Sequence, residues 1–196
     1  TVAEASGESS GAPVPNRSAG YRGWYSHGKG PDRAARAWRV RMKAYRITKR
    51  KHKDTAFSGF GARQYGGRWN LPNHPAVYLS ESIALAQLEI LVNLGEEDSL
   101  QNYLLFQVEV PDSQIMVLAD DAYPKDWNGT RVPAGTQAIG TDFLIDREAL
   151  ALAVRSCVVP QEYNLILNPE HADAEAVIEE AVEVTFQFDA RLSPGS

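Results

Sequence analysis

The chain has one cysteine, four histidines and no long apolar run. The single Cys157 excludes a disulfide framework, and its place in the apolar run CVVP predicts a buried structural thiol. The histidines show no metal-ligand spacing, so the sequence predicts no structural metal. No apolar stretch reaches the length of a membrane span, and no signal peptide is visible. We therefore expect a cytoplasmic protein without a membrane partner.

Charge is unevenly distributed along the 196 residues. Residues 1–41 hold seven Lys/Arg and three Asp/Glu, which leaves 13 Lys/Arg against 22 Asp/Glu for the rest. This acidic body argues against direct binding of nucleic acid. A hydrophobic fraction of 43% and a charged fraction of 23% are typical of a globular domain.

The first 41 residues differ in composition from the rest of the chain. Residues 1–20 are rich in Ser, Gly, Ala and Pro and have few large apolar groups, which predicts a flexible tail. Residues 21–41 add aromatic rings among arginines and could dock on the body or on a partner. We predict a flexible, basic N-terminal extension over residues 1–41 and one domain over residues 42–196.

Alternating and helical patterns share the domain, which predicts an α+β fold around a mostly antiparallel or mixed sheet. Expected strands are KAYRIT, AVYLSES, which ends in helix-capping serines, YLLFQVEV with Phe106, Val108 and Val110 on one face, CVVP, NLILNP, and VEVTFQF with its Val and Phe residues facing in. Expected helices are SIALAQLEILVNLG, stopped by Gly95, and TDFLIDREALALAVRS, capped by Thr141 or Asp142.

The stretch GFGARQYGGRWN, residues 59–70, places four glycines and two arginines in twelve positions. It predicts a loop that approaches a ligand or turns tightly. The dinucleotide fingerprint fails because Gln64 stands where its third glycine is needed. The P-loop fails because Gly67 and Arg68 replace its Lys and Ser/Thr. A phosphate site here would use neither device.

Glu89 is the most informative single residue. Helical spacing places it on or beside the buried face, where an unpaired carboxylate is costly. It either pairs with an arginine inside the fold or faces a cleft. Arg46, inside a strand, poses the same question, and Arg68 follows two glycines that free the backbone to approach an anion. These groups form a structural ion network, or they hold a pyrophosphate and a ribose.

Two other chemistries have weaker support. Ser156 as a nucleophile would need a histidine base, and no histidine has suitable spacing. Glu89 with Asp120 or Asp121 could form a glycosidase pair, but nothing in the spacing selects them.

Four segments in order closely resemble the RES domain: YRIT, SGFGARQYGGRWN, AVYLSESIALAQLEILVNL and VRSCVVPQEYNLILNP. The family takes its name from an Arg, a Glu and a Ser, which match Arg46, Glu89 and Ser156 here. The resemblance runs from about Met42 to Leu192. It implies a split sheet similar to that of diphtheria-toxin-like ADP-ribosyltransferases, with a cleft for an extended dinucleotide. It also implies a bacterial toxin that consumes NAD as a substrate, with water, phosphate or a protein such as phosphoribosyl pyrophosphate synthetase as acceptor.

The resemblance gives the unusual residues a common purpose. Glu89 would hydrogen-bond the nicotinamide ribose and stabilise the positive charge that develops as the glycosidic bond breaks. Ser156 would orient the ribose or the nicotinamide amide. The implied NAD-binding residues are Arg46 and Arg68 on the pyrophosphate, Gly66 and Gly67 in a closing loop, Tyr78 against the nicotinamide, and Tyr65 and Asn164 as lesser candidates.

Toxicity implies a neutralising partner. The resemblance predicts an Xre-type antitoxin that covers the cleft and presents a carboxylate-bearing end to Arg46 and Arg68. A homodimer or a toxin–antitoxin hetero-oligomer fits this interpretation. A module that binds through the same pocket without turnover is the alternative from another class.

Overall fold

The computed structural model describes residues 25–27, 41–95 and 99–192, with side chains from residue 41 onward. Its centre is an eight-stranded sheet in the order β1-β5-β6-β7-β3-β2-β4-β8. The strands are β1 (Tyr25–His27), β2 (Arg41–Lys49), β3 (Val77–Ser80), β4 (Tyr103–Pro111), β5 (Ile115–Leu118), β6 (Ala151–Arg155), β7 (Tyr163–Leu167) and β8 (Val182–Val184). Only β5 and β6 pair in parallel among these strands. The predicted α+β fold with a mostly antiparallel, mixed sheet is confirmed.

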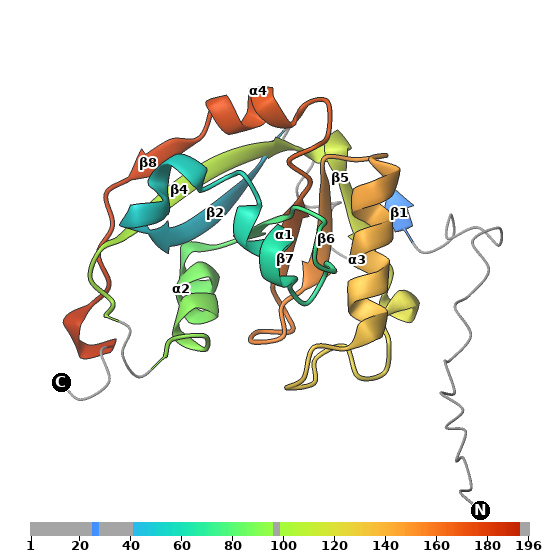
Figure 1. Ribbon diagram of the computed structural model, residues 1–196, viewed down its shortest axis with the longest axis horizontal. Helices are drawn as coiled ribbons and strands as arrows, with labels where there is room; N and C mark the ends of the chain where they lie inside the picture. Colours follow the sequence, from blue (N-terminus) through green and yellow to red (C-terminus); the bar gives the residue numbers. More distant parts are fainter. Residues whose placement is uncertain (1–24, 28–40, 96–98, 193–196) are drawn as a thin grey trace, which may run out of the picture.

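The described helices are α1 (Phe60–Tyr65), α2 (Ile83–Leu91), α3 (Ala134–Asp146) and α4 (Ala174–Glu179). Short 3-10 turns lie at η3 (Arg50–Thr55), η4 (Asp112–Gln114), η5 (Asp120–Ala122) and η6 (Ala190–Leu192). In the view of Figure 1, β6 and β7 lie between α2 and α3. None of the helices among the described residues is both long and apolar enough to cross a membrane.

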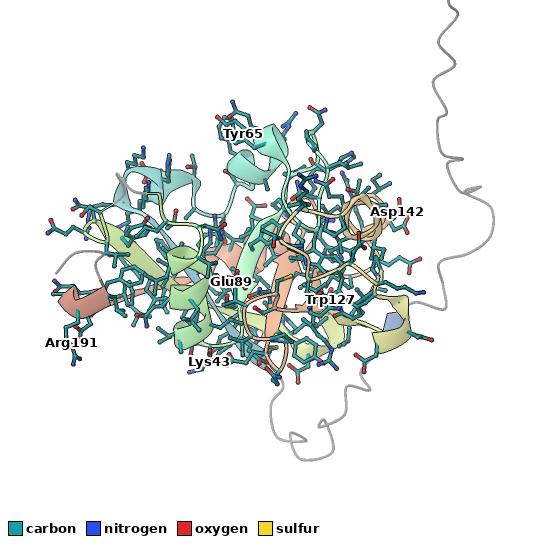
Figure 2. All side chains as sticks on the ribbon, turned by 90° about the horizontal axis from the view of Figure 1, so that it is seen from below. Lys43, Tyr65, Glu89, Trp127, Asp142 and Arg191 are labelled. Atoms are coloured by element: carbon teal, nitrogen blue, oxygen red, sulfur yellow. The ribbon has the colours of Figure 1, made fainter. Side chains whose placement is uncertain are left out.

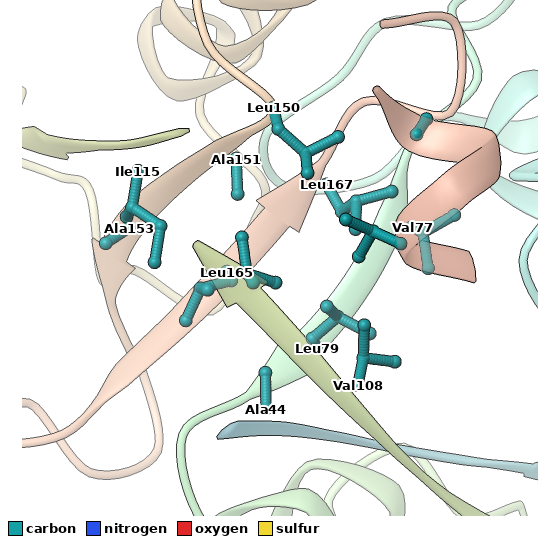
Figure 3. Packing of buried hydrophobic residues seen from close by; sticks show 13 residues of the cluster. Ala44, Val77, Leu79, Val108, Ile115, Leu150, Ala151, Ala153, Leu165 and Leu167 are labelled. Carbon is teal, nitrogen blue, oxygen red and sulfur yellow. The ribbon is translucent and has the colours of Figure 1, made fainter. Parts of the chain in front are cut away.

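The central strands β6 and β7 contribute side chains to two hydrophobic cores, one on each face of the sheet. Ala153 and Leu165 point to the cluster in Figure 3, which α4 covers through Ala174 and Val177. Their neighbours Leu152, Val154 and Ile166 point to the other face, where Ile139 and Phe143 of α3 cover them. A third cluster joins α2 to β2 and β4. The helices therefore fix the positions of β6 and β7 from both sides.

The sheet is nearly divided between β2 and β3. These strands share one residue pair, Tyr45 with Ser80, whereas β2 and β4 pair along nine residues from Arg41 to Lys49. Past this pair, the two strands form no further residue pairs, and the Arg46 side chain of β2 donates to the backbone carbonyl of Tyr78 in β3. The predicted split in the sheet lies here.

Several element predictions were wrong. TDFLIDREALALAVRS is not one helix, because α3 starts earlier and ends at Asp146, where Arg147 takes a left-handed φ of 52°. The following Ala151–Arg155 enters the sheet as β6, with apolar cover on both faces. CVVP forms a loop, not a strand, and α2 ends at Leu91, before Gly95. The β8 strand covers three residues, and its Val182 is exposed, not facing in.

The predicted extension over residues 1–41 lies mostly outside the described residues. Within it, Tyr25–His27 form β1, which pairs antiparallel with β5 at the sheet edge. Arg41 begins β2. The sheet therefore includes at least four residues from the N-terminal side of Met42.

Candidate active site

Two adjoining cavities lie between α2, the split strands, β7 and the loop that precedes α3. The larger has a volume of about 580 Å³ and the smaller, here called the side cavity, about 230 Å³. Both are lined by Tyr78, Glu89, Asn93 and Asn164, so these residues stand at their junction. Gly66, Gly67 and Arg68 line the larger cavity, and Arg46 lines the side cavity. Seven of the nine predicted site residues thus surround one cleft.

Neutral donors hold Glu89 in place. Its Oε1 accepts hydrogen bonds from Ser156 Oγ at 2.8 Å and from Asn164 Nδ2 at 2.6 Å. Among the described residues, Glu89 takes part in no ion pair, and its Oε2 has no hydrogen-bond partner. The arginine partner that a structural role would require is not found there. One carboxylate oxygen is therefore anchored, and the other remains available to a ligand.

The start of α2 explains why Glu89 faces the cleft. Ser82 caps the helix by accepting from the backbone N–H of Leu85 at 3.0 Å, as the sequence predicted. The same hydroxyl donates to Glu162 Oε2 at 2.8 Å, which ties the helix to the loop after β6. Leu85 and Ala86 are buried against the sheet. Glu89 lies one turn further along the same side of the helix.

Asn164 in β7 and Ser156, directly after the end of β6, hold the Glu89 carboxylate. Ser80 Oγ donates to Asn164 Oδ1 at 2.8 Å, so the amide turns its Nδ2 toward Glu89. Ser156 is 0% exposed, and its hydroxyl also accepts from the N–H groups of Val158 and Val159. Ser156 lines neither cavity. Its hydroxyl is engaged by Glu89 and by these two N–H groups, and the predicted contact of Ser156 with a ligand stays a prediction.

Arg46 projects from β2 at the divergence of β2 and β3. Its Nη1 donates to the backbone carbonyl of Tyr78 at 2.9 Å, a carbonyl of the neighbouring strand. Its Nε is buried and has no partner among the described residues. Burial lowers the pKa of Arg46 to about 10, so the group is still a cation at neutral pH. A buried cation without a carboxylate partner indicates a place for an anion.

The glycine-rich stretch is partly helical, which the sequence patterns did not predict. Helix α1 occupies residues 60–65 and has no buried side chain, so its sequence carries no amphipathic pattern that would predict a helix. Gly66 ends it at a φ of 73°, a conformation that favours glycine. At Gly67, a Cβ would lie 2.5 Å from the Tyr78 hydroxyl. Internal packing alone therefore requires both glycines.

Tyr78 is locked beneath this loop. Its hydroxyl donates to Asn70 Oδ1 at 2.7 Å and accepts from the N–H of Trp69 at 3.0 Å. Burial raises the pKa of Tyr78 well above its ordinary value, so the phenol is neutral. Because the hydroxyl is already hydrogen-bonded within the protein, a ligand in either cavity can contact Tyr78 through its ring.

Arg68 joins the larger cavity to the loop before α3. Its Nη1 and Nη2 donate to the carbonyls of Trp127 and Gly129, each at 3.0 Å. The sequence patterns did not identify a second cation in this cavity, Arg155, although it directly precedes Ser156. Arg155 is held by an ion pair with Asp120 at 2.8 Å and by the carbonyl of Pro160. Asp120 is thus committed to Arg155 and forms no pair with Glu89.

Two predictions place their residues differently. Tyr65 is 77% exposed and lines neither cavity, and Figure 2 shows it on α1, apart from Glu89. Cys157 is half-buried and lines the larger cavity, so it is not the buried structural thiol expected. Burial raises the pKa of its thiol, and the nearby Arg68 partly offsets this. The described residues contain no cluster of three His, Cys, Asp or Glu able to hold a metal ion.

The fold and this cleft define a class of protein. Residues 43–189 match the RES domain, so the chain belongs to the RES domain family. The three residues predicted from the resemblance lie close together: Ser156 is bonded to Glu89, and Arg46 and Glu89 line the same side cavity.

Named relatives make the comparison more specific. The chain is 41% identical over 151 residues to "Toxin Res" of Yersinia enterocolitica, an alignment that covers 77% of this chain and 99% of the relative. It is 35% identical over 146 residues to the "Prs ADP-ribosylating toxin" of a Sphingobium species, covering 71% of this chain and 86% of the relative.

A third relative is the "NAD(+) phosphorylase MbcT" of Mycobacterium tuberculosis, 35% identical over 97 residues, which cover 40% of this chain and 52% of the relative. The crystal structure of the MbcT–MbcA toxin–antitoxin complex resembles this fold with a TM-score of 0.56 and 24% identity, covering 74% of this chain and 85% of that one. The structural likeness supports the α+β fold.

Proposed function

We propose that this protein is a bacterial toxin that cleaves the bond between nicotinamide and ribose in NAD. The observation that carries the proposal is Glu89, a carboxylate anchored on one oxygen by Ser156 and Asn164 at the junction of two cavities. The names of the relatives agree, since they describe toxins, an ADP-ribosylating enzyme and an NAD phosphorylase.

In this mechanism the larger cavity, of about 580 Å³, holds the dinucleotide. This volume falls within the range of about 300–1,000 Å³ that is usual for small-molecule sites. Arg68 lies near the pyrophosphate, and the ring of Tyr78 packs against the nicotinamide. Glu89 Oε2 faces the nicotinamide ribose and stabilises the positive charge that grows as the glycosidic bond breaks. Nicotinamide then leaves with the bonding electron pair, and an oxygen of the acceptor, water or phosphate, bonds to the anomeric carbon in its place.

Ser156 and Asn164 serve this mechanism through Glu89. A carboxylate held by two donors reaches the transition state without losing further rotational freedom. The chain of donors from Ser80 through Asn164 leads to Glu89 Oε1, so each donor in it has an acceptor and Oε2 stays available to the ligand.

We further propose an antitoxin partner of the Xre type that covers the cleft. The larger cavity is bordered by exposed apolar side chains, Val92 at 59% and Val132 at 47%, beside the cation Arg68. An apolar segment with a terminal carboxylate matches this surface. The crystallised toxin–antitoxin complex of MbcT with MbcA supports an antitoxin as the partner. We also propose a cytoplasmic location, because both NAD and the antitoxin would be present in the cytoplasm.

The test is release of nicotinamide from NAD by the purified protein. Glu89→Gln keeps an acceptor for Ser156 and Asn164 but removes the charge, and we expect the rate to fall by about 10²–10³, as for loss of one stabilising group. Glu175→Gln is the matched control, because Glu175 is exposed on α4, away from both cavities. Equal rates for the protein and Glu89→Gln would refute the role of Glu89.

The alternative is transfer of ADP-ribose to one protein target. The relative named as a Prs ADP-ribosylating toxin favours it. Incubation with labelled NAD and purified phosphoribosyl pyrophosphate synthetase distinguishes the two. Label on the synthetase, with little free ADP-ribose or its phosphate, would establish the transferase. Nicotinamide release at full rate without any protein added would establish NAD cleavage.

A further inference from the structure

Arg155 is a cation of the larger cavity that has no role in the proposed mechanism. It is the last residue of β6, and its side chain is 28% exposed. Its Nε and Nη2 donate to Asp120 Oδ1 at 3.0 and 2.8 Å, and its Nη1 donates to the carbonyl of Pro160 at 3.0 Å. A guanidinium carries five N–H donors, so these bonds leave two of them without an acceptor among the described residues.

The contacts around Arg155 fix its position more closely than stability requires. The side chain of Asp120 is 71% exposed, and an exposed ion pair contributes only about 0–1 kcal/mol to stability. The guanidinium carbon also lies over the Tyr163 ring, 5.7 Å from its centroid, and the backbone N–H of Arg155 donates to Tyr123 Oη at 2.8 Å. A cation held in this way binds an anion at a low cost in side-chain entropy.

The ion pair directs Arg155 away from the helix that carries Glu89. Asp120 follows β5, so its bond draws the Arg155 side chain toward that strand. Glu89 lies on α2, which packs against β2 and β4. In the sheet, β6, β7 and β3 separate β5 from β2. Arg155 is therefore on the side of the larger cavity that is far from α2.

Arg68, in contrast, belongs to the side of the cavity near Glu89. Its Nη1 and the Cys157 thiol donate to the same carbonyl, that of Trp127, at 3.0 and 3.6 Å. Burial raises the pKa of Cys157 most, and then Arg68 lowers it and Glu89 raises it, so both charges act close to this thiol. Among the described residues, the larger cavity thus presents one arginine near Glu89 and a second one farther away.

We propose that Arg155 binds the phosphate on the adenosine side of NAD and thereby selects the dinucleotide over a mononucleotide. This rests on the proposed function and adds a specificity-determining residue to it. Arg68 then meets the phosphate next to the nicotinamide ribose, which Glu89 faces. The two guanidinium groups match the two negative charges of the pyrophosphate. Asp120 is the positioning residue that holds Arg155 in place.

The kinetic test measures nicotinamide release at varied NAD with Arg155→Met. We expect the KM for NAD to rise about tenfold to a hundredfold, the effect of losing one charge-assisted hydrogen bond, with kcat nearly unchanged. Arg155→Lys keeps the charge and should recover part of the loss. Arg41→Met is the matched control, because Arg41 also pairs with an exposed carboxylate, Glu180, and lines neither cavity. A fall in kcat at an unchanged KM would overturn the proposal.

Two mononucleotides distinguish the two phosphates. AMP carries the adenosine-side phosphate and nicotinamide mononucleotide carries the other, and each is added as a competitor of NAD cleavage. Arg155→Met should weaken inhibition by AMP about tenfold or more and leave inhibition by nicotinamide mononucleotide unchanged. A merely structural role predicts that both competitors weaken equally, which would overturn the proposal. Inhibition by AMP that is absent, or that Arg155→Met leaves unchanged, would overturn it as well.

Calorimetric titration with ADP-ribose separates this proposal from the proposed function, because ADP-ribose has both phosphates but no nicotinamide to release. Binding that is about tenfold weaker or more in Arg155→Met supports the phosphate site. If ADP-ribose binds through Arg155 but NAD is never cleaved, the phosphate site stands and the proposed function falls. If NAD is cleaved but ADP-ribose binds equally to both proteins, or to neither, only the role of Arg155 falls.

Discussion

Replacing Arg46 by methionine should not destabilise the protein, although it removes a charged residue from the interior. Burial lowers the pKa of Arg46 from its ordinary value to about 10. At about 1.36 kcal/mol for each pKa unit, desolvating this cation costs folding roughly 3 kcal/mol. Methionine avoids that cost and fills similar space with a flexible apolar chain. Against this, the carbonyl of Tyr78 loses its donor, which costs about 1–3 kcal/mol.

The expected result is a free energy of unfolding that is unchanged or higher by up to about 2 kcal/mol. Because burial lowers the pKa of this cation, the folding penalty is complete at any pH well below 10 and is relieved only as the pH rises above about 10. The difference between Arg46→Met and the unmodified protein should therefore be the same at about pH 6 and about pH 8.

Equilibrium unfolding in urea, followed by tryptophan fluorescence, measures this difference. If Arg46 were one half of a buried structural ion pair, its removal would lower the free energy of unfolding by about 3–5 kcal/mol. A loss of that size would refute the inference that Arg46 has no internal carboxylate partner and binds an external anion. Arg50→Met, at an exposed position, controls for the general effect of losing an arginine.

Further expectations concern Glu89 and the glycines. Glu89→Gln should change the free energy of unfolding by less than about 1 kcal/mol, whereas Glu89→Ala leaves the buried Ser156 hydroxyl without its acceptor and should lower it by about 1–3 kcal/mol in the same urea assay. A larger loss for Glu89→Gln than for Glu89→Ala would contradict the hydrogen-bond account. At Gly61, an exposed position in α1, a Cβ meets nothing within 4 Å, so Gly61→Ala should stabilise by about 0.5–1 kcal/mol. At Gly140 in α3, a Cβ would lie 1.9 Å from the carbonyl oxygen of Trp69. Gly140→Ala should therefore lower the free energy of unfolding by about 1–3 kcal/mol or more, and with it the thermal midpoint. Equal midpoints for the two glycine variants would show that α3 does not pack so closely on the loop beside the cleft.

Local patterns led to correct predictions where local physics decides the structure. The alternation of YLLFQVEV placed Phe106, Val108 and Val110 on buried positions of β4, because a strand exposes its side chains with a period of two. Ser82 caps α2 because a serine before an apolar helical run satisfies a free backbone N–H. In both cases the decisive partner lies on the same element or within a few residues.

Predictions were wrong where distant elements decided the outcome. Alanine and leucine in ALALAVRS favour a helix when taken alone. In the fold, Ala151–Arg155 lies between β5 and β7, and its two faces are covered by α3 and by α4. Burial on both faces outweighs the weak intrinsic preference for a helix. The segment ALALAVRS by itself favours a helix, because α3 and α4, which cover the two faces of β6, come from elsewhere in the chain.

The site shows the same division. Helical spacing by itself identified Glu89 as a carboxylate on a buried face, and the order of the motifs identified the RES domain family that residues 43–189 match. The tertiary structure alone decided that Glu89 is held by Ser156 and Asn164, 67 and 75 residues away along the chain, in place of an arginine. It also decided that Arg46 and Arg68 line different cavities. The physical reason is that sequence determines which groups need partners, whereas strand register and the divergence of β2 from β3 determine which partners come within reach.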